Sequence, residues 1–200
     1  CMRGYTLAIF GLSNHKLERI REVRFQDQCV EVAVGKEHVY VTTSNFDRPP
    51  HELLNKLWIL NKSGQKVGCV NIEGNWSKVV ALDQNEELAA VSNWYSHDIS
   101  FMDISDKRNP RLIQRVKFGE APRGLLFLPD GGLMVSGFYS ANIGILKRNN
   151  SGWEVTYISN EFDRAKYQGN MRHLVLAPDQ KNALVTNLGR NMVHIWSVQK

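Results

Sequence analysis

Residues 124–136 read Gly124-Leu-Leu-Phe-Leu-Pro-Asp-Gly-Gly-Leu-Met-Val-Ser136, two short apolar runs joined by a tight polar turn. Proline presets the first φ angle of such a turn, while aspartate and glycine tolerate the angles that follow. Each run has the length and composition of a buried strand. The stretch therefore predicts two neighbouring strands connected by a short turn.

The same pattern recurs along the chain every 44–50 residues. A first apolar run and a polar turn lead each time into a second run that ends in a small hydroxyl residue. The first runs are Val30–Val34, Lys78–Leu82, Gly124–Leu128 and His173–Ala177. The hydroxyl residues are Thr42, Ser92, Ser136 and Thr186. An internal repeat of this period is typical of repetitive architectures and decides how the rest of the chain is read.

Two further apolar runs complete each repeat. The third runs are Lys56–Leu60, Asp98–Ile104, Asn142–Leu146 and Met192–Trp196, and the fourth are Lys66–Ile72, Arg111–Phe118 and Trp153–Ile158. Four short strands per repeat, with no helical pattern, predict an all-β fold of four-stranded antiparallel β-propeller blades. A β-sandwich has similar turn spacing, but it does not repeat in phase over every fourth strand.

The repeat divides the chain, taken as one domain over residues 1–200, into blades. We expect a half blade at 5–26, blades at 29–73, 77–118 and 122–159, and a partial blade at 171–198. Because the chain starts in mid-blade and without Met, we favour an excerpt of about four blades from a larger, seven-bladed ring. The alternative is a closed four-bladed ring. Open blade edges predict self-association.

Three stretches carry a resemblance to known propeller families. Residues 121–137 and 170–187 resemble the repeat of YVTN-family β-propellers, and residues 99–113 are similar to the LVIVD repeat. The resemblance implies the lactonase-like seven-bladed superfamily. Its families include cell-surface and periplasmic proteins of unknown role, and the wider superfamily includes lactonases and dehydrogenase subunits. It also points to the periplasm or cell surface, a location that the residues themselves do not assign. The Gly-His and Trp-Asp dipeptides of WD40 blades are missing.

Composition narrows the functional classes. The net charge is +5, but the basic residues are scattered, so no nucleic-acid tail or polybasic membrane patch is expected. No window approaches the about 18 apolar residues of a transmembrane helix. The cysteines are too far apart for metal spacing, and no cofactor motif occurs. We therefore expect no cofactor and no metal. The thiols are predicted to be unpaired, with a Cys29–Cys69 disulfide as the alternative.

Basic residues open the first strand of three repeats: Lys78, Arg123, and Arg172 with His173. First strands line the central channel of a propeller, so these side chains are predicted to converge at its mouth. Guanidinium groups bind carboxylates and phosphates in bidentate fashion. The alternative is that they bond carbonyl groups of neighbouring blades. Lys78 lies one residue later in this alignment, so its side chain is expected on the opposite side.

Other polar groups are interpreted as structural. Asn45, Asn93 and Asn187 are expected to bond their own turns, and the tryptophans to pack between blades. The Ser96-His97-Asp98 sequence is predicted to be a turn, because adjacent residues cannot align as a catalytic triad. Residues 45–48 and 161–164 share the sequence Asn/Glu-Phe-Asp-Arg, which is expected to form a Phe plug with an Asp–Arg pair.

The functional prediction is a non-catalytic binding or scaffold module without catalytic residues. Its partner is expected to be another protein or a small anionic ligand at the basic channel mouth. The alternative is a propeller enzyme of the lactonase or oxidoreductase type, with its site at the central channel. A metal-dependent enzyme would need converging carboxylates there, and the first strands offer Glu31 as their one acidic residue.

Overall fold

The computed structural model describes residues 4–44, 55–140, 142–158 and 170–198. Within these ranges the backbone forms strands and turns and no helix. The first ten strands are β1 (Thr6–Ser13), β2 (Lys16–Arg24), β3 (Gln28–Val34), β4 (His38–Ser44), β5 (Lys56–Asn61), β6 (Lys66–Asn71), β7 (Ser77–Leu82), β8 (Leu88–Asn93), β9 (Asp98–Asp103) and β10 (Arg111–Lys117). The others are β11 (Pro122–Phe127), β12 (Leu133–Gly137), β13 (Ile143–Asn149), β14 (Gly152–Tyr157), β15 (Met171–Leu176), β16 (Asn182–Asn187) and β17 (Met192–Ser197).

Each strand pairs antiparallel with its neighbours in the sequence. The sheets are β1-β2, β3-β4-β5-β6, β7-β8-β9-β10, β11-β12-β13-β14 and β15-β16-β17. Short turns connect the strands, and the polar turn residues of the repeat occupy these positions. The predicted all-β fold of four-stranded antiparallel blades is confirmed.

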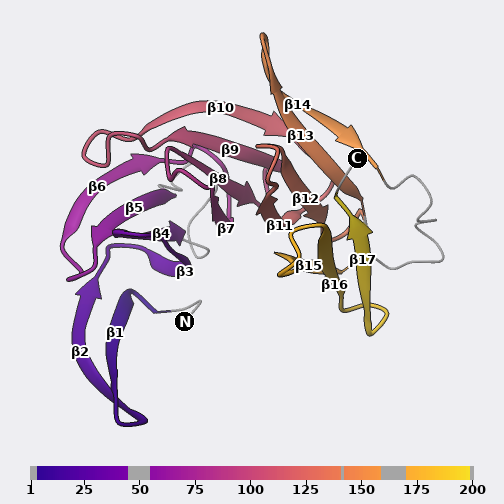
Figure 1. Cartoon of the computed structure of the whole chain (residues 1–200). Coiled ribbons are helices and arrows are strands. Elements are labelled where there is room, and N and C mark those ends of the chain that lie inside the picture. The colour runs from indigo at the N-terminus through magenta and orange to yellow at the C-terminus, as the bar shows by residue number, and fades with distance from the viewer. Residues whose placement is uncertain (1–3, 45–54, 141, 159–169, 199–200) are drawn as a thin grey trace.

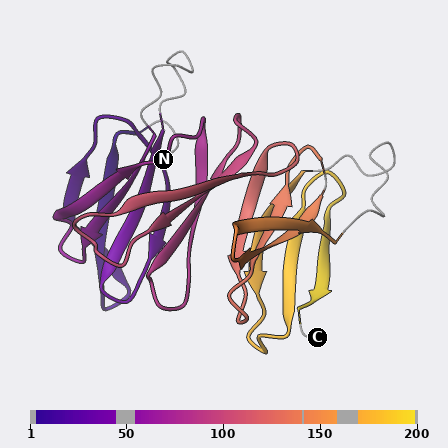
Figure 2. The ribbon, with the colours of Figure 1, turned by 90° about the horizontal axis from the view of Figure 1, so that it is seen from above.

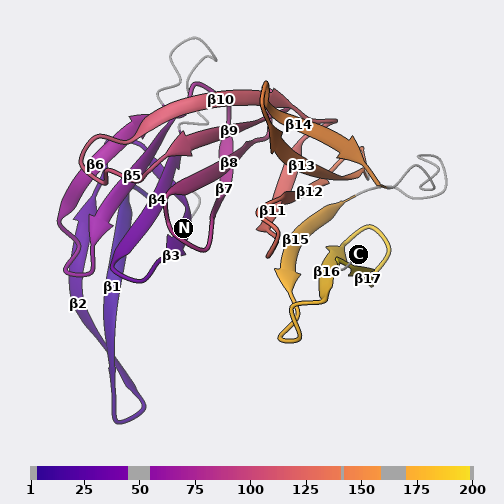
Figure 3. The same cartoon turned by 45° about the horizontal axis from the view of Figure 1, so that its top comes forward.

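The sheets follow one another around an open arc (Figure 1). Figures 1 and 3 both place β3, β7, β11 and β15 on the inner side of the arc and β6, β10 and β14 on its outer side. Seen from above, the strands within each sheet fan out, as expected from the right-handed twist of β-sheets (Figure 2). Consecutive inner strands contact one another, so they line the concave side together.

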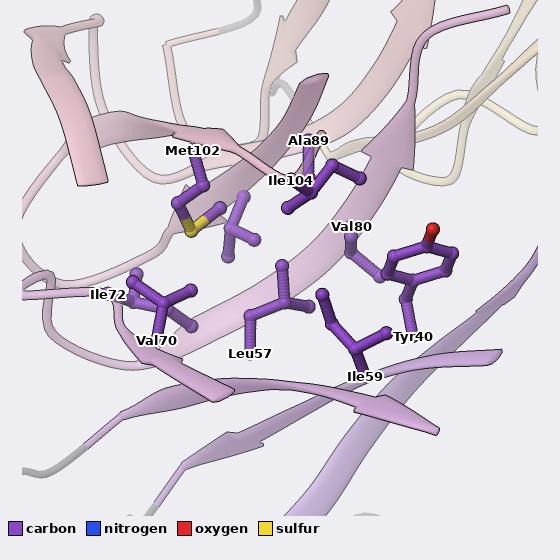
Figure 4. Close-up of a cluster of buried hydrophobic side chains, with 10 residues drawn as sticks. Tyr40, Leu57, Ile59, Val70, Ile72, Val80, Ala89, Met102 and Ile104 are labelled. Carbon is purple, nitrogen blue, oxygen red and sulfur yellow. The ribbon is translucent and has the colours of Figure 1, made fainter. Parts of the chain in front are cut away.

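The core lies between successive sheets, because alternate side chains of a strand point to opposite faces. In β8, Ala89 and Val91 pack toward the preceding sheet, whereas Ala90 packs toward the following one. Figure 4 shows the interface between the second and third sheets, where Tyr40, Leu57 and Ile59 are fully buried. Each of the three four-stranded sheets is thus buried on both faces by its two neighbours, whereas the first and last described sheets have one neighbour each.

Aromatic rings reinforce two of the interfaces. Phe101 and Trp153 stack with centroids 4.2 Å apart and planes 7° from parallel, and Phe25 meets Trp58 edge-on at 5.7 Å. The prediction that tryptophans pack between blades is therefore confirmed for Trp58 and Trp153. Trp94 also contacts the next blade: it lies in the loop after β8, and its ring meets Phe138 and Tyr139 of the loop after β12.

Several smaller predictions can be settled from the described residues. Cys29 and Cys69 are free thiols, as expected; Cys1 lies outside the described ranges. Ser96 and His97 lie in the turn between β8 and β9, and His97 Nδ1 accepts a hydrogen bond from the amide of Ala121, 3.0 Å away, so no triad forms. Asn45 and residues 161–164 lie outside the described ranges, as do residues 46–48. No described helix is long and apolar enough to cross a membrane.

The asparagine prediction is wrong in its mechanism. Asn93 is fully buried and bonds other strands rather than its own turn. It accepts a hydrogen bond from Ser77 Oγ at 2.8 Å and donates to Asp98 Oδ1 and Ser100 Oγ, both at 2.8 Å. A single side chain therefore connects β7, β8 and β9, which a turn interpretation misses.

Candidate functional site

Each inner strand carries a β-bulge near its first residues. The pairing register shifts between Ser77 and Val80 in β7, between Pro122 and Gly124 in β11, and between Met171 and Leu174 in β15. A bulge places two residues of one strand opposite a single residue of the partner strand, and it turns a side chain away from its regular direction. The basic residues of the predicted site lie on these bulges.

The bulges correct the sequence alignment of Lys78. Ser77 pairs with Asn93, Pro122 with Gly137 and Met171 with Asn187. Counted from these pairs, Lys78, Arg123 and Arg172 occupy the same position of their strands. The expectation that Lys78 faces the opposite side is wrong. An alignment of the apolar runs alone does not show the extra residue that each bulge adds to its strand.

The hydroxyl that ends each second strand holds the bulge in place. Ser92 Oγ accepts a hydrogen bond from the amide of Val79 at 3.1 Å and donates to the carbonyl of Arg123, in the next sheet, at 3.3 Å. Thr42 Oγ1 donates in the same way to the carbonyl of Lys78 at 2.9 Å. The backbone of both basic residues is thus anchored to the preceding sheet, which directs their side chains.

The side chains rest on aromatic rings of the loops that follow the second strands. Lys78 Nζ lies 5.9 Å and the Arg123 guanidinium carbon 5.5 Å from the centroid of the Trp94 ring. Arg172 lies 5.9 Å from the ring centroid of Phe138. These cation–π contacts orient the charges without neutralising them. The ring centroids of Trp94 and Phe138 are 4.6 Å apart, so the three cations lie over one aromatic cluster.

The closeness of these cations shifts their pKa values. Burial, followed by the positive charge of Arg123, lowers the pKa of Lys78 to about 8. Burial and then the charge of Arg172 lower the pKa of Arg123, while Glu31 raises it. Arginine stays charged despite such a shift. The structure therefore brings together Lys78, Arg123 and Arg172, with Glu31 as a nearby negative charge.

The two arginines have unused hydrogen-bonding capacity. Nε of Arg123 and Nε of Arg172 are buried and have no hydrogen-bond partner. Among the described residues no carbonyl accepts a bond from either guanidinium, and neither forms an ion pair. The alternative in which these side chains bond carbonyls of neighbouring blades is therefore absent from the described part of the chain.

His173 lies apart from this group in register. Its amide donates a hydrogen bond to Thr186 Oγ1 at 3.1 Å. His173 therefore occupies the strand position that Val79 has in β7 and Gly124 has in β11. Val79 packs toward the following sheet, and a Cβ on Gly124 would come within 2.7 Å of the Arg172 carbonyl of the following sheet. His173 therefore points along the face of the last sheet, where it is exposed, and its part in ligand binding stays a prediction.

One cavity lies away from these cations. It has a volume of about 440 Å³ and is lined by residues of the β7–β8 turn and by Asp103, Arg111 and Arg148. Its lining is more acidic than basic, with Asp83, Glu87 and Asp103 against two arginines, and Arg111 pairs with Asp103 at 2.8 Å, so it does not form a basic anion site. Within the described ranges no three His, Cys, Asp or Glu side chains are placed to hold a metal ion.

Comparison with solved structures identifies the architecture. The chain superposes on the hydrazine synthase of Kuenenia stuttgartiensis with a TM-score of 0.75 and 16% identity, covering 95% of this chain and 58% of that one. It superposes on the periplasmic gluconolactonase PpgL of Pseudomonas aeruginosa with a TM-score of 0.71 and 16% identity, covering 97% and 60%. The fold is that of a β-propeller. At this identity the likeness shows the fold alone.

Sequence comparison adds one distant relative. The chain is 24% identical over 161 residues to antigen Lp49 of Leptospira interrogans, covering 73% of this chain and 34% of the antigen. No model of a known protein family matches. The chain thus spans about a third of that relative and about 60% of the two solved propellers. The YVTN and LVIVD assignments, and the seven-bladed ring, stay predictions.

Proposed function

We propose that this protein is a non-catalytic binding module of the β-propeller type that takes an anionic ligand at the mouth formed by Lys78, Arg123 and Arg172. The observation that carries the proposal is the pair of arginines whose buried Nε groups have no partner. A buried donor without a partner costs about 1–3 kcal/mol. A carboxylate or phosphate would satisfy both guanidinium groups and offset their mutual repulsion.

The experiment is calorimetric titration of the chain with inorganic phosphate and with succinate. The variant Arg123→Ala/Arg172→Ala should bind either anion at least tenfold more weakly, because each charge-assisted contact contributes roughly 1.5–3 kcal/mol. The control Arg108→Ala/Arg148→Ala removes the same charge from exposed positions outside the mouth. Equal affinity of the two double variants would reject the proposal. His173→Ala, measured alongside, decides whether His173 belongs to the site.

The lysine makes the proposed binding depend on pH. Because the pKa of Lys78 is about 8, its positive charge is present below that pH and is lost as the pH rises through it. We expect affinity for succinate, whose carboxylates are ionised throughout, to fall between pH 7 and pH 9. In Lys78→Met the affinity should be lower at pH 7 and unchanged over this range. A pH-independent affinity in the unmodified chain would contradict the assigned role of Lys78.

The lactonase-type enzyme remains the second candidate, supported by the superposition on a protein named as a gluconolactonase. The basic character of the mouth favours binding over metal-assisted hydrolysis. Hydrolysis of glucono-δ-lactone above the spontaneous rate, abolished by Arg123→Ala/Arg172→Ala and retained in Arg108→Ala/Arg148→Ala, would favour the enzyme instead.

A further inference from the structure

Lys78 differs from the exposed lysines of the chain in its surroundings. It is half-buried on the bulge of β7, and its carbonyl is held by Thr42 of the preceding sheet. Its ammonium group and the Arg123 guanidinium lie over the same indole ring of Trp94. Two positive charges that share one aromatic ring repel each other, so the site disfavours the protonated form of the amine.

The consequence is an amine that is partly neutral near physiological pH. With a pKa of about 8, roughly half of the Lys78 side chains are neutral at pH 8, compared with well under one in a hundred for a lysine of pKa about 10.4. Only the neutral amine is a nucleophile, and a desolvated lysine beside another cation is a known way to make one.

We propose that Lys78 is a nucleophilic amine that forms a Schiff base with carbonyl compounds bearing a phosphate or carboxylate group, which Arg123 and Arg172 position. The amine nitrogen attacks the carbonyl carbon, the carbonyl oxygen takes up the two protons that the nitrogen loses and leaves as water, and a C=N bond remains. No electrons are gained or lost. This inference rests on the proposed anion site, because the arginines bind the anionic end of the same compound.

The matched probes are pyridoxal 5′-phosphate and pyridoxal, which carry the same aldehyde with and without a phosphate. The chain is incubated with each at pH 8, reduced with borohydride to fix any imine as a secondary amine, and mapped by peptide mass spectrometry. We expect pyridoxal 5′-phosphate to modify Lys78 at least tenfold faster than the exposed Lys16 and Lys181. Pyridoxal should modify Lys78 at least tenfold more slowly than the phosphorylated probe does.

Two variants separate the parts of the argument. Lys78→Arg cannot form an imine, so the fast modification should disappear while Lys16 and Lys181 react as they do in the unmodified chain. In the variant Arg123→Ala/Arg172→Ala, the two probes should modify Lys78 at similar rates. Modification of Lys78 no faster than that of Lys16, with phosphate binding intact, overturns the nucleophile and leaves the anion site standing. Loss of phosphate preference together with absent phosphate binding overturns both.

Discussion

The hydroxyl of Ser92 has a role out of proportion to its size. It is fully buried, accepts the amide of Val79 from its own sheet and donates to the carbonyl of Arg123 in the next. Thr42 donates to Lys78 in the same way one sheet earlier. Each of these side chains therefore ties the backbone of a basic residue to the neighbouring sheet, which explains why a small hydroxyl residue ends the second strand of each repeat.

We expect Ser92→Ala to lower the free energy of unfolding by about 1–3 kcal/mol, because a buried amide and a buried carbonyl lose their partner. Urea denaturation followed by circular dichroism measures the change. Ser151→Ala, in the exposed turn between β13 and β14, is the control and should change it by less than about 0.5 kcal/mol. Equal stability of the two variants would show that the hydroxyl bridge contributes nothing measurable.

The sheet β7–β10 is held together by a polar cluster at the end nearest the site. Asn93 of β8 bonds Ser77 of β7 and both Asp98 and Ser100 of β9. Asp98 is 1% exposed and also accepts hydrogen bonds from Ser96 and from Arg115 of β10. The cluster therefore spans all four strands and fixes the loop that carries Trp94.

Asn93→Ala should destabilise the chain by about 2–4 kcal/mol, since it leaves several buried polar groups without partners and opens a cavity. Thermal and urea unfolding measure this loss, with Asn109→Ala in an exposed turn as the control. Because Trp94 follows directly in the chain, phosphate binding should weaken as well. A stable variant with unchanged binding would mean that the cluster does not position the loop.

Within the described residues, the first and last sheets each have a face that no other sheet covers. Phe10, Leu12 and Leu17 are 52%, 73% and 71% exposed on the first sheet, and Val193 and Ile195 are 55% and 69% exposed on the last. Equivalent faces of the inner sheets are buried in cores between blades. Contiguous apolar surface of this kind favours association in water.

The isolated chain is therefore expected to self-associate at micromolar concentration. Sedimentation velocity measures the mass distribution, and Val193→Lys/Ile195→Lys should shift it toward monomer. Ile113→Lys, at an exposed apolar position on the outer strand β10, should leave it unchanged. A compact monomer in the unmodified chain would refute this expectation.

Local sequence patterns predict much of the fold. Turns such as Pro129-Asp130-Gly131 are set by residues adjacent in the chain, and strands such as Leu88–Asn93 by their apolar composition, so strand order and sheet membership follow from the sequence. The repeat then aligns Arg123 with Arg172 at the start of successive inner strands. These features depend on interactions within a few residues or on a regular period.

The tertiary structure decided the rest of the site. A bulge adds one residue opposite its partner strand, so only the actual pairing of Ser77 with Asn93 shows that Lys78 shares the position of the arginines. The aromatic support of Arg172 comes from Phe138 in the preceding sheet, a contact that no local pattern encodes. The sequence by itself determined the blades and the basic residues. Their convergence, the unpartnered Nε groups of Arg123 and Arg172 and the depressed pKa of Lys78 arise because neighbouring sheets pack at one register and exclude water from the same space.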